Sequence, residues 1–264
     1  MKRIRLRIAY DGTNYHGWQI QKNGVTVEQR LSEALLVLLG EETELIGASR
    51  TDAGVHAIGN VAVFDTDSHI PPEKFAIALN HYLPEDIRIL HSQEVKSDFH
   101  PRHCDSIKTY EYTILAAQTE IPVSSRYSYH VYRPLDIDKM RQVAKMLEGT
   151  HDFSAFCSAG SQVADKVRTI YDISINEIPF SERWGDNISG ILEGREIRIR
   201  VSGSGFLYNM VRIIAGTLIE AGQGSRAADS IRKALESGDR SSAGPTAPAR
   251  GLMLVGIQYV DERV

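Results

Sequence analysis

The stretch Arg50-Thr51-Asp52-Ala53-Gly54-Val55-His56 concentrates the residue types that can do chemistry. It brings together a guanidinium, a carboxylate and an imidazole, and an apolar run over residues 61–64 follows it. A nearby guanidinium lowers the pKa of a carboxyl group and keeps it ionised. An ionised carboxylate held at the end of a strand can act as a nucleophile or as a general base. Asp52 is therefore the first catalytic candidate, with Arg50 as its neighbouring cation.

Two other interpretations of this stretch stay open on the residues alone. Asp52-Ala53-Gly54 is also an ordinary turn after a strand, in which Arg50 would be a structural ion-pair partner. Asp52 and His56 could serve a metal-dependent hydrolase, but Gly54 disfavours the helix that would place them on one face. The chain has no HExxH motif and no cysteine pair at zinc spacing, so we expect no metal site.

Other catalytic motifs are missing from the sequence. There is no G-x-S-x-G elbow for a serine hydrolase. Gly203-Ser204-Gly205 is not followed by the Gly-Lys-Ser/Thr of a nucleotide-binding loop, so a tight turn is the better interpretation.

Composition places the chain among ordinary globular proteins. It has 264 residues, 42% hydrophobic and 24% charged, which is enough for one large domain or two smaller ones. No apolar run approaches the roughly 18 residues that a membrane-spanning helix needs. Arg5 and Arg7 interrupt any hydrophobic region near the N-terminus, which argues against a secretory signal. With only Cys104 and Cys157, in no motif, we expect a reduced, cytoplasmic setting without membrane contact.

The charge distribution argues only mildly against a nucleic-acid partner. The net charge is −4, yet 21 of the 30 basic residues are arginine, whose planar fork suits phosphates and base edges. Two strictly alternating segments, residues 3–8 and 197–201, each predict a half-buried strand with arginines on its outer face. A solvated face is one interpretation of these arginines, and an RNA-binding face is the other. The candidates for such a face are Arg3, Arg5, Arg7, Arg198 and Arg200.

Periodicity along the chain predicts two similar α/β halves. The segments IRLRIAYDGTNYHGW and IRIRVSGSGFLYNMV both give an alternating strand, a glycine turn and then aromatic residues. Helices are expected after a capping box at Thr26 and Gln29, from Pro72 to Tyr82, after Asp136, from Phe206 towards Glu220, and over residues 227–235. Further strands are expected at 45–46, 61–64, 109–115 and 252–259, and residues 179–193 are expected to be a surface loop. We place the halves at residues 1–105 and 106–264.

Several blocks of the sequence closely resemble the tRNA pseudouridine synthase A family. They run in family order over nearly the whole chain: YDGTNYHGWQIQ, RTDAGVHA, NHYLPEDIRI, DFHPRHCDSIKTYEY, GTHDFSAF, GFLYNMVRIIAGTL and APARGLMLVGI. The RTDAGVH block is the most specific of them. One departure is Ser49, where many members have glycine.

The resemblance implies a function, a set of site residues and a fold. The family isomerises uridine to pseudouridine in the anticodon stem-loop of tRNA, with positions 38, 39 and 40 expected. It needs no cofactor and is homodimeric. Asp52 matches the catalytic aspartate, as nucleophile or base; Arg50 and Arg212 match active-site arginines. Tyr110 matches the tyrosine that stacks on the target base, and Leu252 a pocket-lining residue. The implied α/β (α+β) fold has two ferredoxin- or RRM-like halves. They form a mixed, largely antiparallel central sheet with helices on one face and a cleft between them.

The chemistry of this reaction is consistent with the residues present. The reaction exchanges a C1′–N1 bond for a C1′–C5 bond without redox change, so a carboxylate beside the ribose and an aromatic platform for the extruded base suffice. A non-catalytic RNA-binding module of the same fold remains the alternative. It would keep the arginines and aromatic residues but would not need Asp52.

Overall fold

The chain divides into two compact units in a computed structural model that describes residues 1–161, 163–185 and 193–260. Residues 1–107 and the segment from residue 253 form the first unit, and residues 108–252 form the second. The last strand, β10 (Leu252–Tyr259), lies in the first unit except for its first residue, Leu252. In this unit β10 runs parallel to β3 (His56–Thr66), with Met253 opposite His56.

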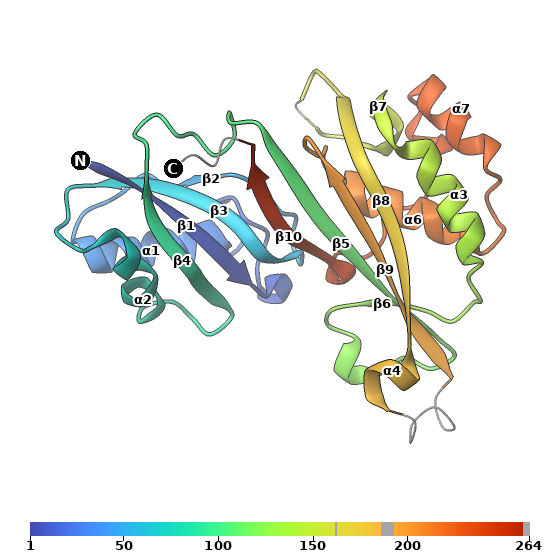
Figure 1. Cartoon of the computed structure of the whole chain (residues 1–264), viewed down its shortest axis with the longest axis horizontal. Helices are drawn as coiled ribbons and strands as arrows, with labels where there is room; N and C mark the ends of the chain where they lie inside the picture. Colours follow the sequence, from blue (N-terminus) through green and yellow to red (C-terminus); the bar gives the residue numbers. More distant parts are fainter. Residues whose placement is uncertain (162, 186–192, 261–264) are drawn as a thin grey trace. The chain divides into compact units, whose positions relative to one another are not determined.

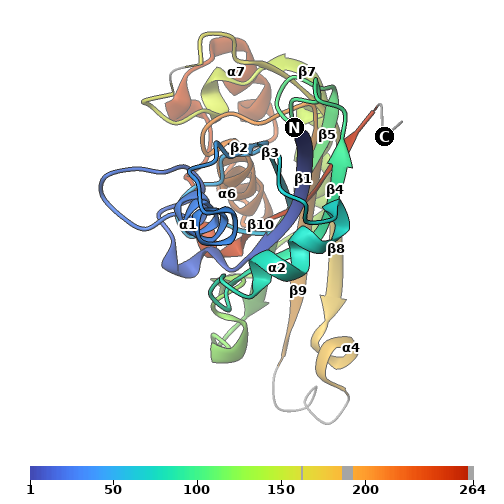
Figure 2. The same cartoon turned by 90° about the vertical axis from the view of Figure 1, so that its left-hand side faces the viewer.

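The first unit is built on a sheet with the strand order β4-β1-β3-β10, to which β2 adds on β3. Its strand pairs are antiparallel except for β3–β10. The alternating arginine segment forms β1 as predicted, and its apolar residues Ile4, Leu6 and Ile8 are completely buried. Helices α1 and α2 lie on the same side of this sheet (Figure 2). The other strands of this unit are β1 (Lys2–Tyr10), β2 (Ile46–Gly47) and β4 (Ile87–Val95), and its helices are α1 (Val27–Leu39) and α2 (Phe75–Asn80).

Helix α1 begins and ends where the sequence predicts. The Thr26 side chain accepts a hydrogen bond from the Gln29 backbone N–H at 3.3 Å, and Gly40 ends the helix in the left-handed conformation at φ 77°. The capping box is only half formed, because the Gln29 side chain donates to Glu33 instead of accepting from the Thr26 N–H. The helix expected from Pro72 is shorter than predicted, with a 3₁₀ turn at Pro72–Lys74 ahead of α2.

The strands of the second unit run in the order β5-β9-β8-β7, with β6 paired to the other edge of β5 (Figure 1). Every pair is antiparallel except β5–β6. The predicted strand at 197–201 lies within β9, where Ile197, Ile199 and Val201 are fully buried. Its strands are β5 (Ser106–Ala117), β6 (Tyr129–Val131), β7 (Gly149–Asp152), β8 (Val167–Pro179) and β9 (Gly194–Gly203); its helices are α3 (Ile137–Leu147), α4 (Phe180–Trp184), α6 (Met210–Gly222) and α7 (Asp229–Ser237). The predicted class, α/β with a mixed, largely antiparallel sheet, is confirmed.

Helix α6 is the central helix of the second unit. Nearly all of its residues are buried, as in a helix surrounded by protein. It starts at Met210, not at Phe206 as predicted, because Asn209 adopts the left-handed conformation and breaks the helical path. The loop after α7 lies very close to it: a Cβ on Gly216 would come within 1.9 Å of the Pro245 carbonyl oxygen. This glycine therefore lets the loop that leads to Leu252 pack directly on α6.

Four strands, β4, β6, β7 and β8, and one short helix, α4, were not predicted. In the two long ones, β4 and β8, a register shift interrupts the pairing. It lies opposite Arg7 and Ile8 of β1 for β4, and between Ile170 and Asp172 for β8. An extra residue in a strand breaks the simple alternation that sequence analysis depends on. The expected loop at 179–193 contains helix α4, whose Phe180 packs against Trp184, and residues 186–192 lie outside the described residues. No helix in the described ranges has the length and apolar character that crossing a bilayer requires.

Candidate functional site

Asp52 lies in the loop that joins β2 to β3 in the first unit. The Asp52 carbonyl accepts a hydrogen bond from the Val55 N–H at 3.1 Å, and Gly54 has a φ of 77°. The segment is thus a tight turn that needs glycine at its third residue, as the sequence predicts. Asp52 is partly exposed and Arg50 is exposed, while Thr51 between them is buried. The loop therefore presents the two charged residues and anchors itself through Thr51.

A second segment of the same unit supports this loop through its backbone. The Trp18 N–H donates to the Thr51 carbonyl at 3.0 Å, and the Gly54 N–H donates to the Tyr15 carbonyl at 3.2 Å. Gly17 lies so close that a Cβ there would come within 2.6 Å of the Thr51 oxygen, and its φ is 87°. The YHGW motif is therefore a brace for the loop that carries Asp52, and its glycine is required by contact as well as by conformation.

A buried polar network holds the other side of the loop. The Tyr10 hydroxyl and the Thr51 hydroxyl are hydrogen-bonded at 2.7 Å. The side-chain amide of Asn60 donates to the Ser49 carbonyl at 3.1 Å and approaches the Tyr10 hydroxyl at 3.3 Å. Asn60 is completely buried, and the three other residues are at most 7% exposed. A satisfied network of this kind fixes one conformation, because each buried polar group needs its partner.

His56 is buried next to the turn that follows β1. Its Nδ1 accepts a hydrogen bond from the Gly12 N–H at 3.0 Å and lies 3.1 Å from a carboxylate oxygen of Asp11. A Cβ on Gly12 would overlap the Val55 carbonyl, at 2.0 Å. His56 therefore packs the Asp11–Gly12 turn against the start of β3. Within the residues that the structure describes, no group of three His, Cys, Asp or Glu residues is arranged to hold a metal ion.

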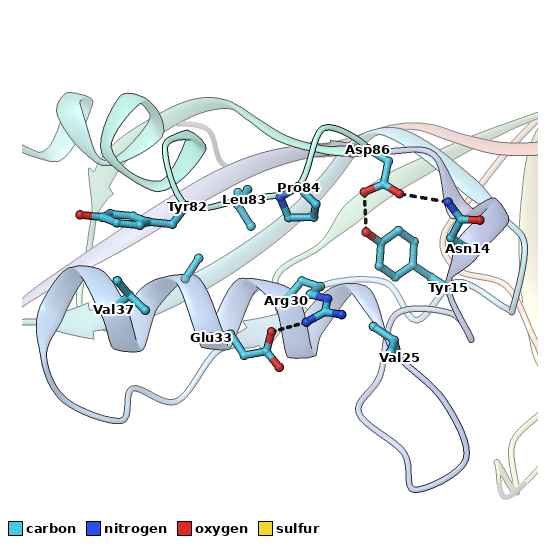
Figure 3. Close-up of a pocket in the computed structure, with 11 residues that line it drawn as sticks. Asn14, Tyr15, Val25, Arg30, Glu33, Val37, Tyr82, Leu83, Pro84 and Asp86 are labelled. Atoms are coloured by element: carbon cyan, nitrogen blue, oxygen red, sulfur yellow. Dashed lines mark hydrogen bonds and ion pairs between the residues drawn. The ribbon is translucent and has the colours of Figure 1, made fainter.

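A hollow of about 570 Å³ lies beside the YHGW segment, between α1 and the loop after α2 (Figure 3). On one side, the Tyr15 hydroxyl donates to Asp86 at 2.5 Å and the Asn14 amide donates to the same carboxylate at 3.3 Å. Burial, and then the Asp86 carboxylate, raise the pKa of Tyr15, so its hydroxyl keeps its proton. This hollow contains none of the predicted site residues. The Tyr15–Asp86 hydrogen bond anchors the segment whose backbone holds Gly54.

Tyr110 lies on β5 in the second unit and is 7% exposed. Its ring meets the ring of Phe206 edge to face, with centroids 5.3 Å apart and planes at 87°. Such a contact fixes the orientation of an aromatic ring. Phe206, from the GFLYNMVR block, thus supports Tyr110. The sequence analysis did not identify this role of Phe206.

Arg212 lies in the first turn of α6, and two of its nitrogen atoms are held by the protein. Its Nε donates to the Ala247 carbonyl at 2.8 Å, and its Nη1 donates to the Asn209 side-chain oxygen at 2.7 Å. The backbone reinforces this contact, since the Ala247 N–H donates to the Arg212 carbonyl at 3.1 Å. Arg212 is therefore both a candidate site residue and a support for the loop that precedes Leu252.

Leu252 follows that loop and is 5% exposed. The hydroxyl of the fully buried Tyr112 donates to the Pro248 carbonyl at 2.8 Å, and burial raises the pKa of this tyrosine. Gly251 passes close to the same ring, where a Cβ would lie 2.7 Å from Cζ. Within this unit, Arg212 holds Ala247 and Tyr112 holds the next residue, Pro248. Both residues belong to the segment that leads to Leu252.

The predicted RNA-binding arginines have structural contacts of their own. Arg3 makes a bidentate pair with Asp65, at 2.8 and 2.6 Å, and Arg5 lies over the rings of Phe99 and Tyr259. Arg7 is exposed on the same strand.

On the second unit, Arg198 pairs with Glu196 at 2.6 Å and Arg200 with Glu111 at 3.0 Å. Both carboxylates are buried, 2% and 8% exposed, so these two arginines neutralise charges that the fold encloses. An RNA-binding role for the five arginines stays a prediction.

Comparison with known proteins gives a consistent result over the whole chain. The family model described as tRNA pseudouridine synthase matches residues 7–103 and 143–260. A tRNA pseudouridine synthase A of Acetivibrio thermocellus is 48% identical over 259 residues, which is 98% of this chain and 100% of that protein. Relatives with the same description include one from Brevibacillus brevis, 44% identical over 259 residues with the same coverage. The protein described as tRNA pseudouridine synthase A 2 of Clostridium tetani is 48% identical over 261 residues, 98% of this chain and 99% of that one.

Proposed function

This chain belongs to the tRNA pseudouridine synthase family, and from that premise we propose that Asp52 carries the reaction. The reaction is the isomerisation of uridine to pseudouridine in tRNA. The bond between C1′ and N1 of the uracil breaks and a bond between C1′ and C5 forms. The hydrogen leaves C5 and N1 gains one, so no atom is added or lost.

The proposed role of Asp52 is to start the cleavage of the C1′–N1 bond. Its carboxylate acts either as a nucleophile at C1′ or as a base at C2′. The observation that carries the proposal is the construction of the loop. The buried Thr51 is hydrogen-bonded to Tyr10, and Gly17 and Trp18 pack on the backbone, while Asp52 itself stays partly exposed. Such preorganisation is what a group that attacks a substrate requires.

The other residues have proposed roles that follow from their chemistry. Arg50 and Arg212 supply positive charge for the carboxylate and for charge that develops during bond cleavage. Tyr110 supplies an aromatic surface for the base and a hydroxyl for proton transfer, and Leu252 supplies an apolar pocket wall. The close resemblance to the family at each of these positions supports the assignment.

Several finer properties belong to the same proposal. We propose that the target uridines are positions 38, 39 and 40 of the anticodon stem-loop. We also propose that the enzyme works in the cytoplasm, as a homodimer and without a cofactor. Sedimentation of the purified protein at micromolar concentration tests the dimer. Mapping pseudouridine in tRNA from cells that lack the gene tests the positions.

The direct test of the proposed function is the variant Asp52→Asn. The amide keeps the shape of the side chain but cannot act as an anionic nucleophile or accept a proton as a base. We expect pseudouridine formation to fall below detection, while tRNA binding and the melting temperature stay close to those of the wild type. The matched control is Asp67→Asn, because Asp67 is an exposed carboxylate of the same unit, with 78% of its side chain accessible. An Asp52→Asn variant within about tenfold of the wild-type rate, a barrier change of about 1.4 kcal/mol, would remove Asp52 from the mechanism.

A further inference from the structure

Asn209 has an unusual backbone at the start of α6. Its φ and ψ are 60° and 7°, and it is the one residue other than glycine with a positive φ among the residues that the structure describes. Asparagine tolerates this left-handed conformation better than most residues, but glycine adopts it at no steric cost. A reason for asparagine must therefore lie in its side chain.

The side chain of Asn209 does not cap its own helix. An asparagine at this position usually accepts a hydrogen bond from a backbone N–H of the first turn, and here no such bond is present. Instead, its Oδ1 accepts from Nη1 of Arg212 at 2.7 Å, and its Nδ2 donates to the Ser158 hydroxyl at 2.9 Å. The orientation of the amide is fixed by chemistry, because a guanidinium can only donate. Both ends of the side chain are thus committed to contacts outside the cap.

The contact from Asn209 completes the placement of the Arg212 guanidinium. Two different nitrogen atoms of this planar group are held: Nε of Arg212 donates to the Ala247 carbonyl, and Nη1 donates to Asn209. Two hydrogen bonds to a rigid fork define its plane and therefore the direction in which its remaining N–H groups point.

We propose that Asn209 is a positioning residue that orients Arg212 for the isomerisation. The inference rests on the proposed role of Arg212 in the reaction. Ser158 completes the arrangement: its hydroxyl accepts from Asn209, and its own N–H donates to the Tyr208 carbonyl at 3.1 Å. The loop around Ser158 is thereby tied to the residue that holds the arginine.

The test separates the side chain of Asn209 from its backbone. Asn209→Gly keeps the left-handed conformation and removes the amide, so folding is preserved while Arg212 loses one partner. We expect its single-turnover rate of pseudouridine formation to fall about tenfold, with tRNA affinity within about twofold of wild type. Asn209→Asp keeps an acceptor for Nη1 and can accept from the Ser158 hydroxyl. It should restore the rate to within about threefold of wild type.

A double-mutant cycle with Arg212→Gln identifies the route of the effect. If Asn209 acts through Arg212, adding Asn209→Gly to Arg212→Gln should change the rate by less than about twofold. An unchanged rate in Asn209→Gly, or the same tenfold fall in both backgrounds, would overturn the inference. If Asn209→Gly does not fold, Ser158→Ala carries the test, since it removes the second contact of the amide and leaves the backbone alone. A rate equal to wild type in that variant counts against the proposal.

Failure of the proposed function gives a different result. In that case the wild-type protein forms no pseudouridine, or Arg212→Gln is as active as wild type. Failure of the inference alone leaves an active wild type and a defective Arg212→Gln, with Asn209→Gly unaffected.

Discussion

Asn60→Ala should weaken both the fold and the reaction, because the Asn60 side chain supports the loop that carries Asp52. The amide of Asn60 is completely buried and donates to the Ser49 carbonyl at 3.1 Å. Alanine removes this donor from the buried carbonyl, and losing one partner of a buried hydrogen bond costs about 1–3 kcal/mol. The weaker contact to the Tyr10 hydroxyl, at 3.3 Å, adds about 0.5 kcal/mol. We therefore expect a loss of about 1.5–3.5 kcal/mol in the free energy of unfolding.

The assay has to separate lost stability from lost positioning. Thermal or urea unfolding gives the first quantity, and the single-turnover rate on tRNA, measured well below the unfolding transition, gives the second. Asn80→Ala is the matched control, because the Asn80 side chain also makes two backbone hydrogen bonds, to Ile89 at 2.9 and 2.8 Å, in the same unit. It should lower stability by a comparable amount and leave the rate per folded molecule within about twofold of wild type. Asn60→Ala should lower that rate about tenfold.

Two results would refute this reasoning. If Asn60→Ala is as stable as wild type, the hydrogen bonds of the network do not contribute as the geometry indicates. If Asn60→Ala and Asn80→Ala lose stability equally and both keep the wild-type rate, the network stabilises the unit but does not position Asp52.

Three further predictions concern charge and metal. The Arg3 guanidinium holds the pKa of the Asp65 carboxyl below its usual range, so the pair stabilises the fold above about pH 4, and this contribution is lost as the pH falls through the lowered pKa. Asp65→Asn should therefore lower stability at pH 6 by about 1 kcal/mol and by less at pH 3, as measured by urea unfolding; an equal loss at both values would contradict it. The affinity for tRNA should fall steeply as the salt concentration rises. In a plot of the logarithm of the association constant against the logarithm of salt concentration, Arg7→Gln should make the slope less steep by about one; an unchanged slope removes Arg7 from the binding face. Activity should survive dialysis against EDTA when the tRNA is refolded in monovalent salt, and a loss that zinc alone restores would contradict a cofactor-free reaction.

The outer faces of the arginine strands show how a sequence pattern can be right about a strand and incomplete about its side chains. Alternation in residues 3–8 and 197–201 correctly predicts which residues are buried. It cannot predict that Arg200 lies beside the buried Glu111, because Glu111 comes from another strand, opposite Arg200 in the pairing of β5 with β9. For this reason, reversing Arg198 and Arg200 to glutamate is a poor test of RNA binding. It would place carboxylates next to enclosed carboxylates and destabilise the unit.

The candidate site shows the same limit at the level of single contacts. The RTDAGVH block predicts the turn, since Gly54 allows a left-handed residue and the charged residues flank it. The partners that hold this turn are separated from it in sequence: Tyr10 precedes Thr51 by 41 residues. Residue types and local spacing carry no information on such contacts.

Asn209 is the clearest case of a contact that only the structure reveals. Local preference is consistent with an asparagine at the start of a helix, where it would serve as a cap. The left-handed backbone instead directs its side chain to Arg212, so the helix begins four residues later than its apolar pattern predicts. A local rule is broken next to a candidate catalytic residue, and strained backbone is often found where function requires one orientation. The late start of α6 and the fixed arginine therefore have the same structural cause, which the exchange of Asn209 for glycine or aspartate tests directly.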